Sequence, residues 1–257
     1  MKKEGSKQEA SVLFEGMSSF RALLYAMENG VSDRRITRLL LDAGKAAKKS
    51  AEHAFIRKMS EKHGFDVSMS SADEINSIAL GTSHGGVVFF CTERTIPHLS
   101  ADAIAEGGFY VMLEGIEDPY NFGYAIRSVY AAGADGIILT LRSWMSAAGV
   151  VCRSSAGASE RLPAFAEDGV SAVRLFHDAG YRCIAAGIRD SVSSFDADLK
   201  KPIFLVVGGE RRGISKAVLN ECDSIVRLDY GREFPGSLSA ASAASILAYE
   251  VLRQNRK

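Results

Sequence analysis

The sequence has no uninterrupted apolar stretch long enough for a signal sequence or a membrane span, and its first ten residues, MKKEGSKQEA, are charged throughout. We therefore expect a cytoplasmic protein with no membrane partner. An excess of charge is also missing, because 31 Lys and Arg residues balance 31 Asp and Glu residues. The field of the whole protein thus gives no case for nucleic acid, although local basic surfaces can still exist.

Cysteine is scarce, and its spacing does not suit the usual cysteine-based sites. The sequence has four cysteines: Cys91, Cys152, Cys183 and Cys222. They show no Cys-x-x-Cys spacing, and three of them lie in or beside apolar runs. This pattern predicts buried thiols rather than zinc ligands or disulfides, and we expect no metal. Apolar material is plentiful, since 47% of the 257 residues are hydrophobic. That is enough for one large core or two ordinary ones and indicates a globular protein.

The first hundred residues alternate between helical and strand-like segments. We expect helices at 16–30, 45–64 and 71–80, and strands at 36–42, 65–69 and 85–91. This order predicts a small α/β domain over residues 1–100. A polar stretch that contains Pro97 follows, and we place a linker near residues 95–107.

The second half predicts an α/β domain with a mostly parallel sheet over residues 107–257. Short apolar strands alternate with helices there, which is typical of a parallel sheet covered on both faces. We expect strands at 109–115, 136–140, 181–187, 203–210 and 224–229. We expect helices at 121–132, 147–156, 171–179 and 238–253.

Three segments of this second half follow strands, where open α/β sheets bind their ligands. The first is LEGIEDPYNFGYAIRSVYAAGADGIIL. We expect Asp118-Pro119 to end the strand and Gly123 to free the backbone. Asn121 and Arg127 are six residues apart, and both could reach one pocket if Asn121 lies in the turn before the helix.

The second segment, FLVVGGERRGISKAV, brings a buried strand to Gly208-Gly209-Glu210, where a ligand could lie against bare backbone amides. Alone, this pattern is more often a tight turn. The third segment, DYGREFPGSLSAASAASILAYEVLRQ, is a loop followed by a helix of small residues. The helix N-terminus and the small side chains permit close approach of a cofactor, or simply packing against a neighbouring helix.

Together and in this order, the three segments resemble the signature motifs of the SpoU (TrmH) family of RNA ribose 2′-O-methyltransferases, in the SPOUT superfamily. NFGYAIR resembles Asn-x-Gly-x-x-x-Arg, GGERRG resembles Gly-x-Glu-x-x-Gly, and GSLSAASAAS resembles the Ser-Leu-Asn motif with its helix. The first hundred residues resemble the family's substrate-binding domain. The resemblance implies a C-terminal domain with a deep trefoil knot, S-adenosylmethionine as cofactor, ribosomal or transfer RNA as substrate, and a homodimer whose active site combines both subunits.

The resemblance also implies roles for individual residues. Asn121 and Arg127 match the catalytic pair of the first motif, Glu210 matches the acidic residue of the second, and Ser237 matches the serine of the third. The residues implied to line the cofactor site are Ala186, Gly187, Gly208, Leu228, Ser237 and Leu238.

Two departures from the family pattern keep other readings open. Ser239 places a hydroxyl where the family has a carboxamide that orients catalytic neighbours, and Asp229 places a carboxylate where the family has a proline. An alternative is therefore an RNA-binding or ribosome-assembly protein of the same fold with its activity lost. A second alternative is methyl transfer to a base atom, which the first motif argues against.

Chemistry constrains what the matched residues can do. A ribose 2′-hydroxyl is a poor nucleophile until its proton leaves or its developing charge is stabilised. Because a guanidinium with a pKa above ~12 is rarely neutral, we interpret Arg127 as an electrostatic clamp on the alkoxide or the adjacent phosphate. We expect RNA contacts from basic clusters, which neutralise phosphates: Arg34, Arg35, Arg38, Lys45, Lys48, Lys49, Arg57, Lys58, Lys62, Arg153, Arg211 and Arg212.

Overall fold

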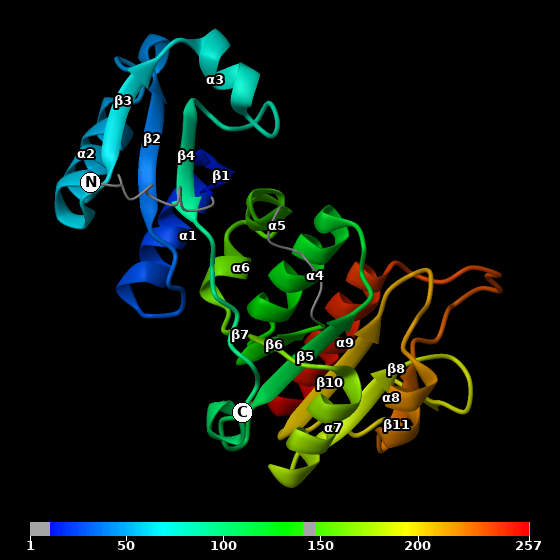
Figure 1. Cartoon of the computed structure of the whole chain (residues 1–257). Helices are drawn as coiled ribbons and strands as arrows, with labels where there is room; N and C mark the ends of the chain where they lie inside the picture. The colour runs from blue at the N-terminus through cyan, green and yellow to red at the C-terminus, as the bar shows by residue number, and fades with distance from the viewer. Residues whose placement is uncertain (1–10, 141–146, 257) are drawn as a thin grey trace, which may run out of the picture.

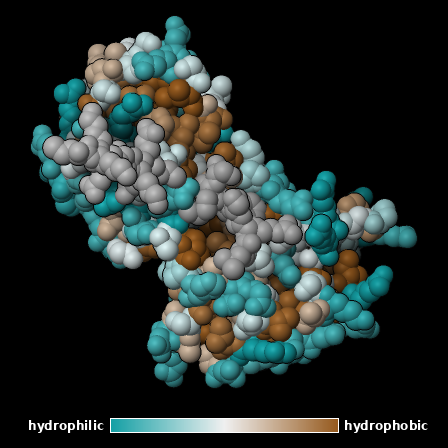
Figure 2. Space-filling model, viewed as in Figure 1, coloured by the Kyte–Doolittle hydropathy of each residue, from teal (hydrophilic) through white to brown (hydrophobic). Residues whose placement is uncertain are grey.

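The computed structural model describes residues 11–140 and 147–256, so the charged segment 1–10 lies outside them. The chain forms two sheets, one in each half of the molecule (Figure 1). The first sheet has four strands in the order β1-β4-β2-β3, and the second has seven in the order β7-β6-β5-β10-β8-β11-β9. Figure 2 shows the same two lobes in space-filling form, with hydrophobic and hydrophilic residues intermingled on this face.

The first sheet is mixed, with β2 parallel to β3 and β4 antiparallel to both β1 and β2. Its strands are β1 (Ser11–Glu15), β2 (Ile36–Asp42), β3 (Asp66–Ser70) and β4 (Val87–Thr92). Its helices are α1 (Gly16–Glu28), α2 (Ser50–His63) and α3 (Ala72–Ile78), with a 3-10 turn at Ala43–Lys45. The structure adds β1, which the sequence analysis did not predict because its five residues run directly into α1.

Alternate residues of these strands face two different apolar layers, as a pleated sheet requires. On one face, Phe14 and Phe89 stack with ring centroids 5.7 Å apart, and Phe20 of α1 packs edge-on against Phe89. On the other face, Ile75 of α3 covers Val88. Burial of both faces makes this half a small α/β layer structure.

The second sheet is parallel in every strand pairing of the described residues, which confirms the predicted mostly parallel sheet. Its strands are β5 (Phe109–Glu114), β6 (Gly136–Leu139), β7 (Ala164–Ala166), β8 (Arg182–Ala186), β9 (Val192–Ser193), β10 (Ile203–Gly208) and β11 (Ser224–Arg227). The helices are α4 (Pro119–Ala131), α5 (Ala148–Ser154), α6 (Ala158–Arg161), α7 (Gly169–Asp178), α8 (Lys216–Glu221) and α9 (Ala240–Asn255).

Both faces of this sheet are covered, as expected. Val111 and Leu205 belong to an apolar cluster with residues of α4, α5, α6 and α9, whereas Met112 and Phe204 belong to a second cluster with α7 and α8. Among the described residues, no helix combines the length and the apolarity that crossing a membrane requires.

Buried side chains join the two halves. Arg34 Nε lies 3.2 Å from Glu160 Oε2, and both side chains are buried. The equally buried Arg94 donates to the carbonyl oxygens of Val31 and Ser159. The stretch predicted as a linker is anchored as well, because its Pro97 carbonyl accepts from the Ala166 N–H. The junction is therefore tied by paired charges and hydrogen bonds, which a buried polar group requires.

The cysteines behave as buried thiols. All four are free, with three buried and Cys222 half-buried. Burial raises the pKa of Cys222 to about 12 and that of Cys91 well above its ordinary value, because the charged thiolate loses its hydration. These thiols are protonated at neutral pH and pack as small apolar side chains.

Candidate functional site

A cavity of about 910 Å³ opens where strands β8, β10 and β11 end. Every residue expected to line the cofactor site lies in its wall: Ala186, Gly187, Gly208, Leu228, Ser237 and Leu238. Because parallel strands end at one edge of the sheet, three loops that are distant in the sequence converge there. Ligand pockets commonly have volumes of roughly 300–1,000 Å³, so the cavity has the size of a small-molecule site.

The two glycines at the end of β10 are required by the close approach of the turn that follows and of the residue after β5. A Cβ on Gly208 would lie 2.5 Å from the Gly213 carbonyl carbon, and a Cβ on Gly209 would lie 2.1 Å from the Gly115 carbonyl oxygen. The Gly209 N–H also donates to the Glu114 carbonyl at 2.7 Å. These contacts assign the glycines a packing role in addition to the expected exposure of backbone amides to a ligand.

Glu210 connects all three motif segments. Its Oε1 accepts a hydrogen bond from the Asn121 side-chain amide at 3.3 Å and another from the backbone N–H of Ala240 at 3.1 Å. Ala240 is the first residue of α9, so the carboxylate lies at the N-terminus of that helix, where the helix dipole favours a negative charge. The structure thus brings Asn121, Glu210 and the start of the third motif's helix together.

Asn121 lies within the first turn of α4, as the helix expected at 121–132 implies, so the condition under which it and Arg127 could reach one pocket is not met. Asp118 caps α4 by accepting from the Asn121 N–H at 2.7 Å, and Pro119 occupies the first helical position, which suits its fixed backbone angle. Six residues along a helix correspond to a rotation of about 120° between side chains. Asn121 and Arg127 therefore point in different directions.

Arg127 is exposed and does not line the cavity of its own chain. Among residues 11–140 and 147–256, no carboxylate forms an ion pair with it. Tyr120 and Tyr124, seven and three residues before it, lie on the same face of α4 and are 40% and 49% exposed. This face presents aromatic rings and one free cation to the surroundings.

Gly123 also has a different role from the expected one. It is buried inside α4, and a Cβ there would lie 1.9 Å from Ser154 Oγ of α5. The glycine therefore lets two helices pack closely and does not mark a flexible turn.

Ser239 is the N-cap of α9. Its Oγ accepts from the Ser242 N–H at 3.1 Å, and the preceding Leu238 N–H donates to the Tyr230 hydroxyl at 3.1 Å. Serine and asparagine are about equally good at this position, because each offers a side-chain oxygen to the first helical N–H groups. The Ser239 hydroxyl therefore caps α9 as an asparagine at this position could.

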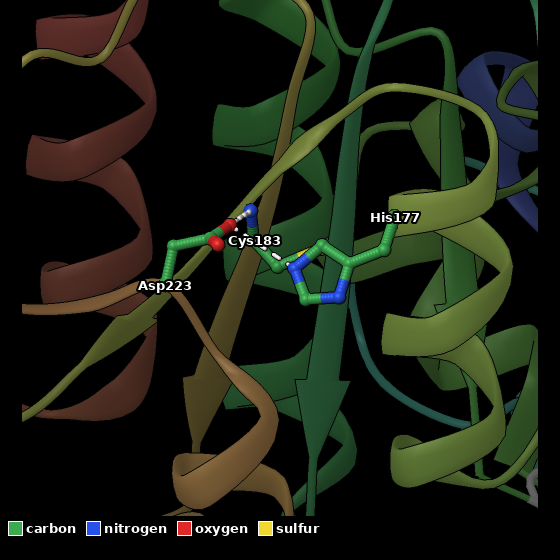
Figure 3. A group of neighbouring side chains, drawn as sticks. All are labelled: His177, Cys183 and Asp223. Carbon is green, nitrogen blue, oxygen red and sulfur yellow. Dashed lines mark hydrogen bonds and ion pairs between the residues drawn. The ribbon is translucent and has the colours of Figure 1, made fainter.

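A polar cluster that the sequence analysis missed lies at the other end of β8 (Figure 3). Asp223 Oδ2 accepts from the Cys183 backbone N–H at 2.8 Å and lies 3.1 Å from His177 Nε2. The ligand-type atoms of His177, Cys183 and Asp223 all lie within 4.8 Å of one another. Burial raises the pKa of the Cys183 thiol, whose sulfur contacts the Val173 carbonyl. The bonds of Asp223 tie α7 and the turn before β11 to the start of β8.

Several basic residues expected to contact RNA have partners inside the molecule. Arg34 is buried against Glu160, and Arg153 pairs with the buried carboxylate of Glu15. These two arginines join the halves of the protein and are corrected from RNA ligands to structural residues. Exposed ion pairs also engage Lys45, Lys49, Lys62 and Arg211.

Comparison with known proteins agrees with this geometry. The sequence model of the SpoU rRNA Methylase family matches residues 108–249. The chain belongs to this family. The matched region contains the cavity, the Glu210 network and all of α4, which confirms the resemblance drawn from the three motifs.

Related sequences of the SpoU family carry methyltransferase names. An uncharacterized tRNA/rRNA methyltransferase of Mycolicibacterium vanbaalenii is 31% identical over 189 residues, which cover 71% of this chain and 60% of the relative. A protein with the same description from Mycobacterium ulcerans is 35% identical over 147 residues, covering 57% and 47%. The chain thus spans about half the length of the curated relatives it matches.

Solved structures share the fold over nearly the whole chain. An RNA 2′-O ribose methyltransferase superposes with a TM-score of 0.77 at 20% identity, covering 96% of this chain and 89% of the other. An AdoMet-bound rRNA methyltransferase from Sinorhizobium meliloti gives a TM-score of 0.75 at 25% identity, covering 96% and 88%. AdoMet is S-adenosylmethionine. The first of these similarities supports the fold alone.

Proposed function

We propose that this SpoU family member is an RNA methyltransferase that uses S-adenosylmethionine to methylate a ribose 2′-hydroxyl of ribosomal or transfer RNA. The observation that carries the proposal is the cavity at the ends of β8, β10 and β11, which Glu210 connects to the first and third motifs. The AdoMet-bound relative from Sinorhizobium meliloti supports the choice of cofactor.

The cavity suits a nucleoside. Its wall combines apolar side chains such as Leu228, Leu238 and Leu247 with the glycine backbone of Gly187 and Gly208. Such a surface can hold a flat base between apolar groups while strand-end amides and carbonyls bind its polar edge. Acidic and basic side chains line the cavity in equal number, so its net charge does not by itself select a cationic ligand: Asp190, Glu210, Asp229, Arg189, Lys216 and Arg227.

The residues of the chain then have distinct tasks. The chemistry that bound S-adenosylmethionine supplies is a methyl group already activated by the sulfonium charge. Glu210 holds the Asn121 amide and the start of α9 in a fixed arrangement, so Asn121 can orient the ribose. Ser237 can position either substrate from the cavity rim. Arg127 stabilises the developing alkoxide or the neighbouring phosphate as a fixed cation.

Because Arg127 faces away from the cavity of its own chain, we propose that a second copy completes the site. The outer faces of α4 and α9 expose large apolar side chains: Tyr120, Tyr124, Tyr130, Ile246 and Tyr249. Exposed large apolar side chains on two helices that pack together are typical of a protein interface. A homodimer that covers these faces would bring Arg127 to the cavity of the partner.

Further parts of the proposal concern the fold and the RNA. The trefoil knot stays a prediction drawn from the family resemblance. We assign RNA binding to residues 1–100, joined by residues 95–107 to a catalytic domain at 107–257. The exposed basic residues Lys48 and Lys58 of this first domain suit phosphate contacts. A cytoplasmic location remains a prediction.

The test is methyl transfer from labelled S-adenosylmethionine to purified ribosomal and transfer RNA, followed by mass spectrometry of the nucleosides. We expect label in 2′-O-methylated nucleosides. Label on a base would contradict ribose methylation, and RNA binding without any transfer would point to the non-enzymatic alternative.

A further inference from the structure

Asp229 stands at the junction between the cavity and a neighbouring hollow, and its carboxylate is fully engaged. The side chain lines both the 910 Å³ cavity and an adjoining one of about 420 Å³. One carboxylate oxygen accepts from the Ser193 hydroxyl, and the other accepts from Arg227 Nε at 2.9 Å. These two bonds lower the pKa of Asp229, the Ser193 bond being the larger cause, so the carboxylate is charged at neutral pH.

The partners of Asp229 hold the outer wall of the cavity. Arg227 also donates through Nη1 to the Ser191 carbonyl at 2.6 Å. Ser193 accepts from the Phe195 N–H at 3.1 Å through the same oxygen that donates to Asp229. One carboxylate therefore organises residues 191–195 through two donor side chains, the neutral hydroxyl of Ser193 and the charged guanidinium of Arg227.

Backbone hydrogen bonds also support this wall, from the Gly187 N–H to the Val226 carbonyl and from the Ser194 N–H to the Arg227 carbonyl. The strand β9 within it has only two residues and pairs on one side with the end of β11. Ahead of β9, Asp190 adopts a left-handed backbone with φ of 49°, a conformation that persists only when the surroundings hold it. Residues 187–190 line the cavity directly, and Ile188 is 70% exposed. The position of the wall thus depends on how firmly residues 191–195 are fixed.

We infer that Asp229 is a positioning residue of the cofactor site, which fastens the wall formed by residues 187–195 and so sets the affinity for S-adenosylmethionine. The inference rests on the proposed function. Where the resembling family motif has a proline that stiffens the backbone, this chain uses a carboxylate with two side-chain bonds. Asp229 and the family's proline then both fix this segment of the chain, so the departure at Asp229 is not a sign of lost activity.

The experiment is calorimetric titration of the full chain with S-adenosylmethionine, together with hydrogen exchange over residues 188–196. The variants are Asp229→Asn, Ser193→Ala and Ser193→Thr. The matched control is Asp198→Asn, because Asp198 also pairs with an arginine, Arg182, at 2.8 Å but lines neither cavity. The double variant of Asp229 and Ser193 shows whether the two side chains act as one unit.

We expect Asp229→Asn to weaken binding about tenfold and to speed exchange in the wall, because a charge-assisted hydrogen bond network is lost. Ser193→Ala should act similarly and non-additively, while Ser193→Thr, which keeps the hydroxyl, should retain the affinity. Asp198→Asn should change neither the affinity for S-adenosylmethionine nor the exchange rates of the wall. Unchanged affinity in Asp229→Asn would overturn the inference. If the wild-type chain binds no S-adenosylmethionine at millimolar concentration, the proposed function fails, and the exchange rates alone then decide whether Asp229 holds the wall.

Discussion

Acidic residues have different roles at the two ends of the parallel strands, which we call the amino edge and the carboxyl edge of the seven-stranded sheet. At the amino edge, Asp135 and Asp223 accept hydrogen bonds from the N–H groups at the starts of β5 and β8, each at 2.8 Å. At the carboxyl edge, Glu210 and Asp229 bond to loops and to the start of a helix and line a cavity.

Strand polarity explains the difference. A parallel strand presents its free N–H groups at one end and its free carbonyls at the other, so a carboxylate can cap only the amino end. At the carboxyl end the same group has no strand donor to satisfy and remains available for loops and ligands. The comparison indicates that acidic residues at the amino edge stabilise the fold, whereas those at the carboxyl edge serve the site.

The largest expected effect tests the catalytic side of this comparison. Arg127→Ala should lower the rate of methyl transfer by about 10²–10³-fold, as removal of one transition-state donor does in other enzymes. Affinity for S-adenosylmethionine and the unfolding midpoint should stay the same, since no carboxylate of the described residues pairs with Arg127. Initial rates with labelled cofactor provide the measurement. Arg174→Ala, which removes an exposed arginine near the amino edge, is the control and should leave the rate intact.

At the amino edge the expected loss is in stability. Asp223→Ala leaves the N–H of Cys183 without its acceptor and removes the partner of His177. We expect the free energy of unfolding to fall by about 1–3 kcal/mol, the cost of an unsatisfied buried donor. Urea denaturation measures this change. A loss of cofactor affinity at unchanged stability would break the proposed division between the edges.

The opposite pattern is expected at Glu210. Glu210→Ala frees the Asn121 amide and the Ala240 N–H, so affinity for S-adenosylmethionine should fall about tenfold, with a loss of stability no larger than that of Asp223→Ala. Titration calorimetry and urea denaturation of the same variant give both numbers. Glu221→Ala, which removes an exposed carboxylate of α8, serves as the control. Equal losses of cofactor affinity in Glu210→Ala and Glu221→Ala would show that the cavity does not depend on Glu210.

The smallest effect concerns the altered third motif. Ser239→Ala removes the cap of α9 and should cost about 1 kcal/mol of stability, whereas Ser239→Asn should be close to neutral. Thermal unfolding distinguishes the two. If Ser239→Asn instead raised the methyl transfer rate strongly, the residue would act in chemistry and not only as a cap.

The sequence predicted the elements whose periodicity is long enough to detect. Strands β5 and β10 are nearly continuous apolar runs, and both faces of their sheet are covered as expected. The short elements β7, β9 and α8 were missed because they carry neither a long apolar run nor enough residues to show a period.

Within the site, the motifs identified the cavity wall but not the direction of each side chain. The Asp118-Pro119 pair was interpreted as the end of a strand, although an aspartate followed by proline is also the start signal of a helix, and α4 begins at Pro119, two residues before the expected start. The pairing of Arg34 with Glu160, 126 residues away, depends on how the halves dock and leaves no local trace in the sequence. The same applies to the bond between Glu210 and Ala240.

The central claim is that the cavity at the carboxyl edge binds S-adenosylmethionine. Ultraviolet cross-linking of the radiolabelled cofactor, followed by peptide mapping, tests it most directly, because Tyr230 and Phe234 of the cavity wall offer aromatic rings for the reaction. The account predicts label in peptides that cover residues 207–214 and 225–240, competed away by unlabelled cofactor. Label confined to other peptides, or none above the level of a denatured sample, would contradict it.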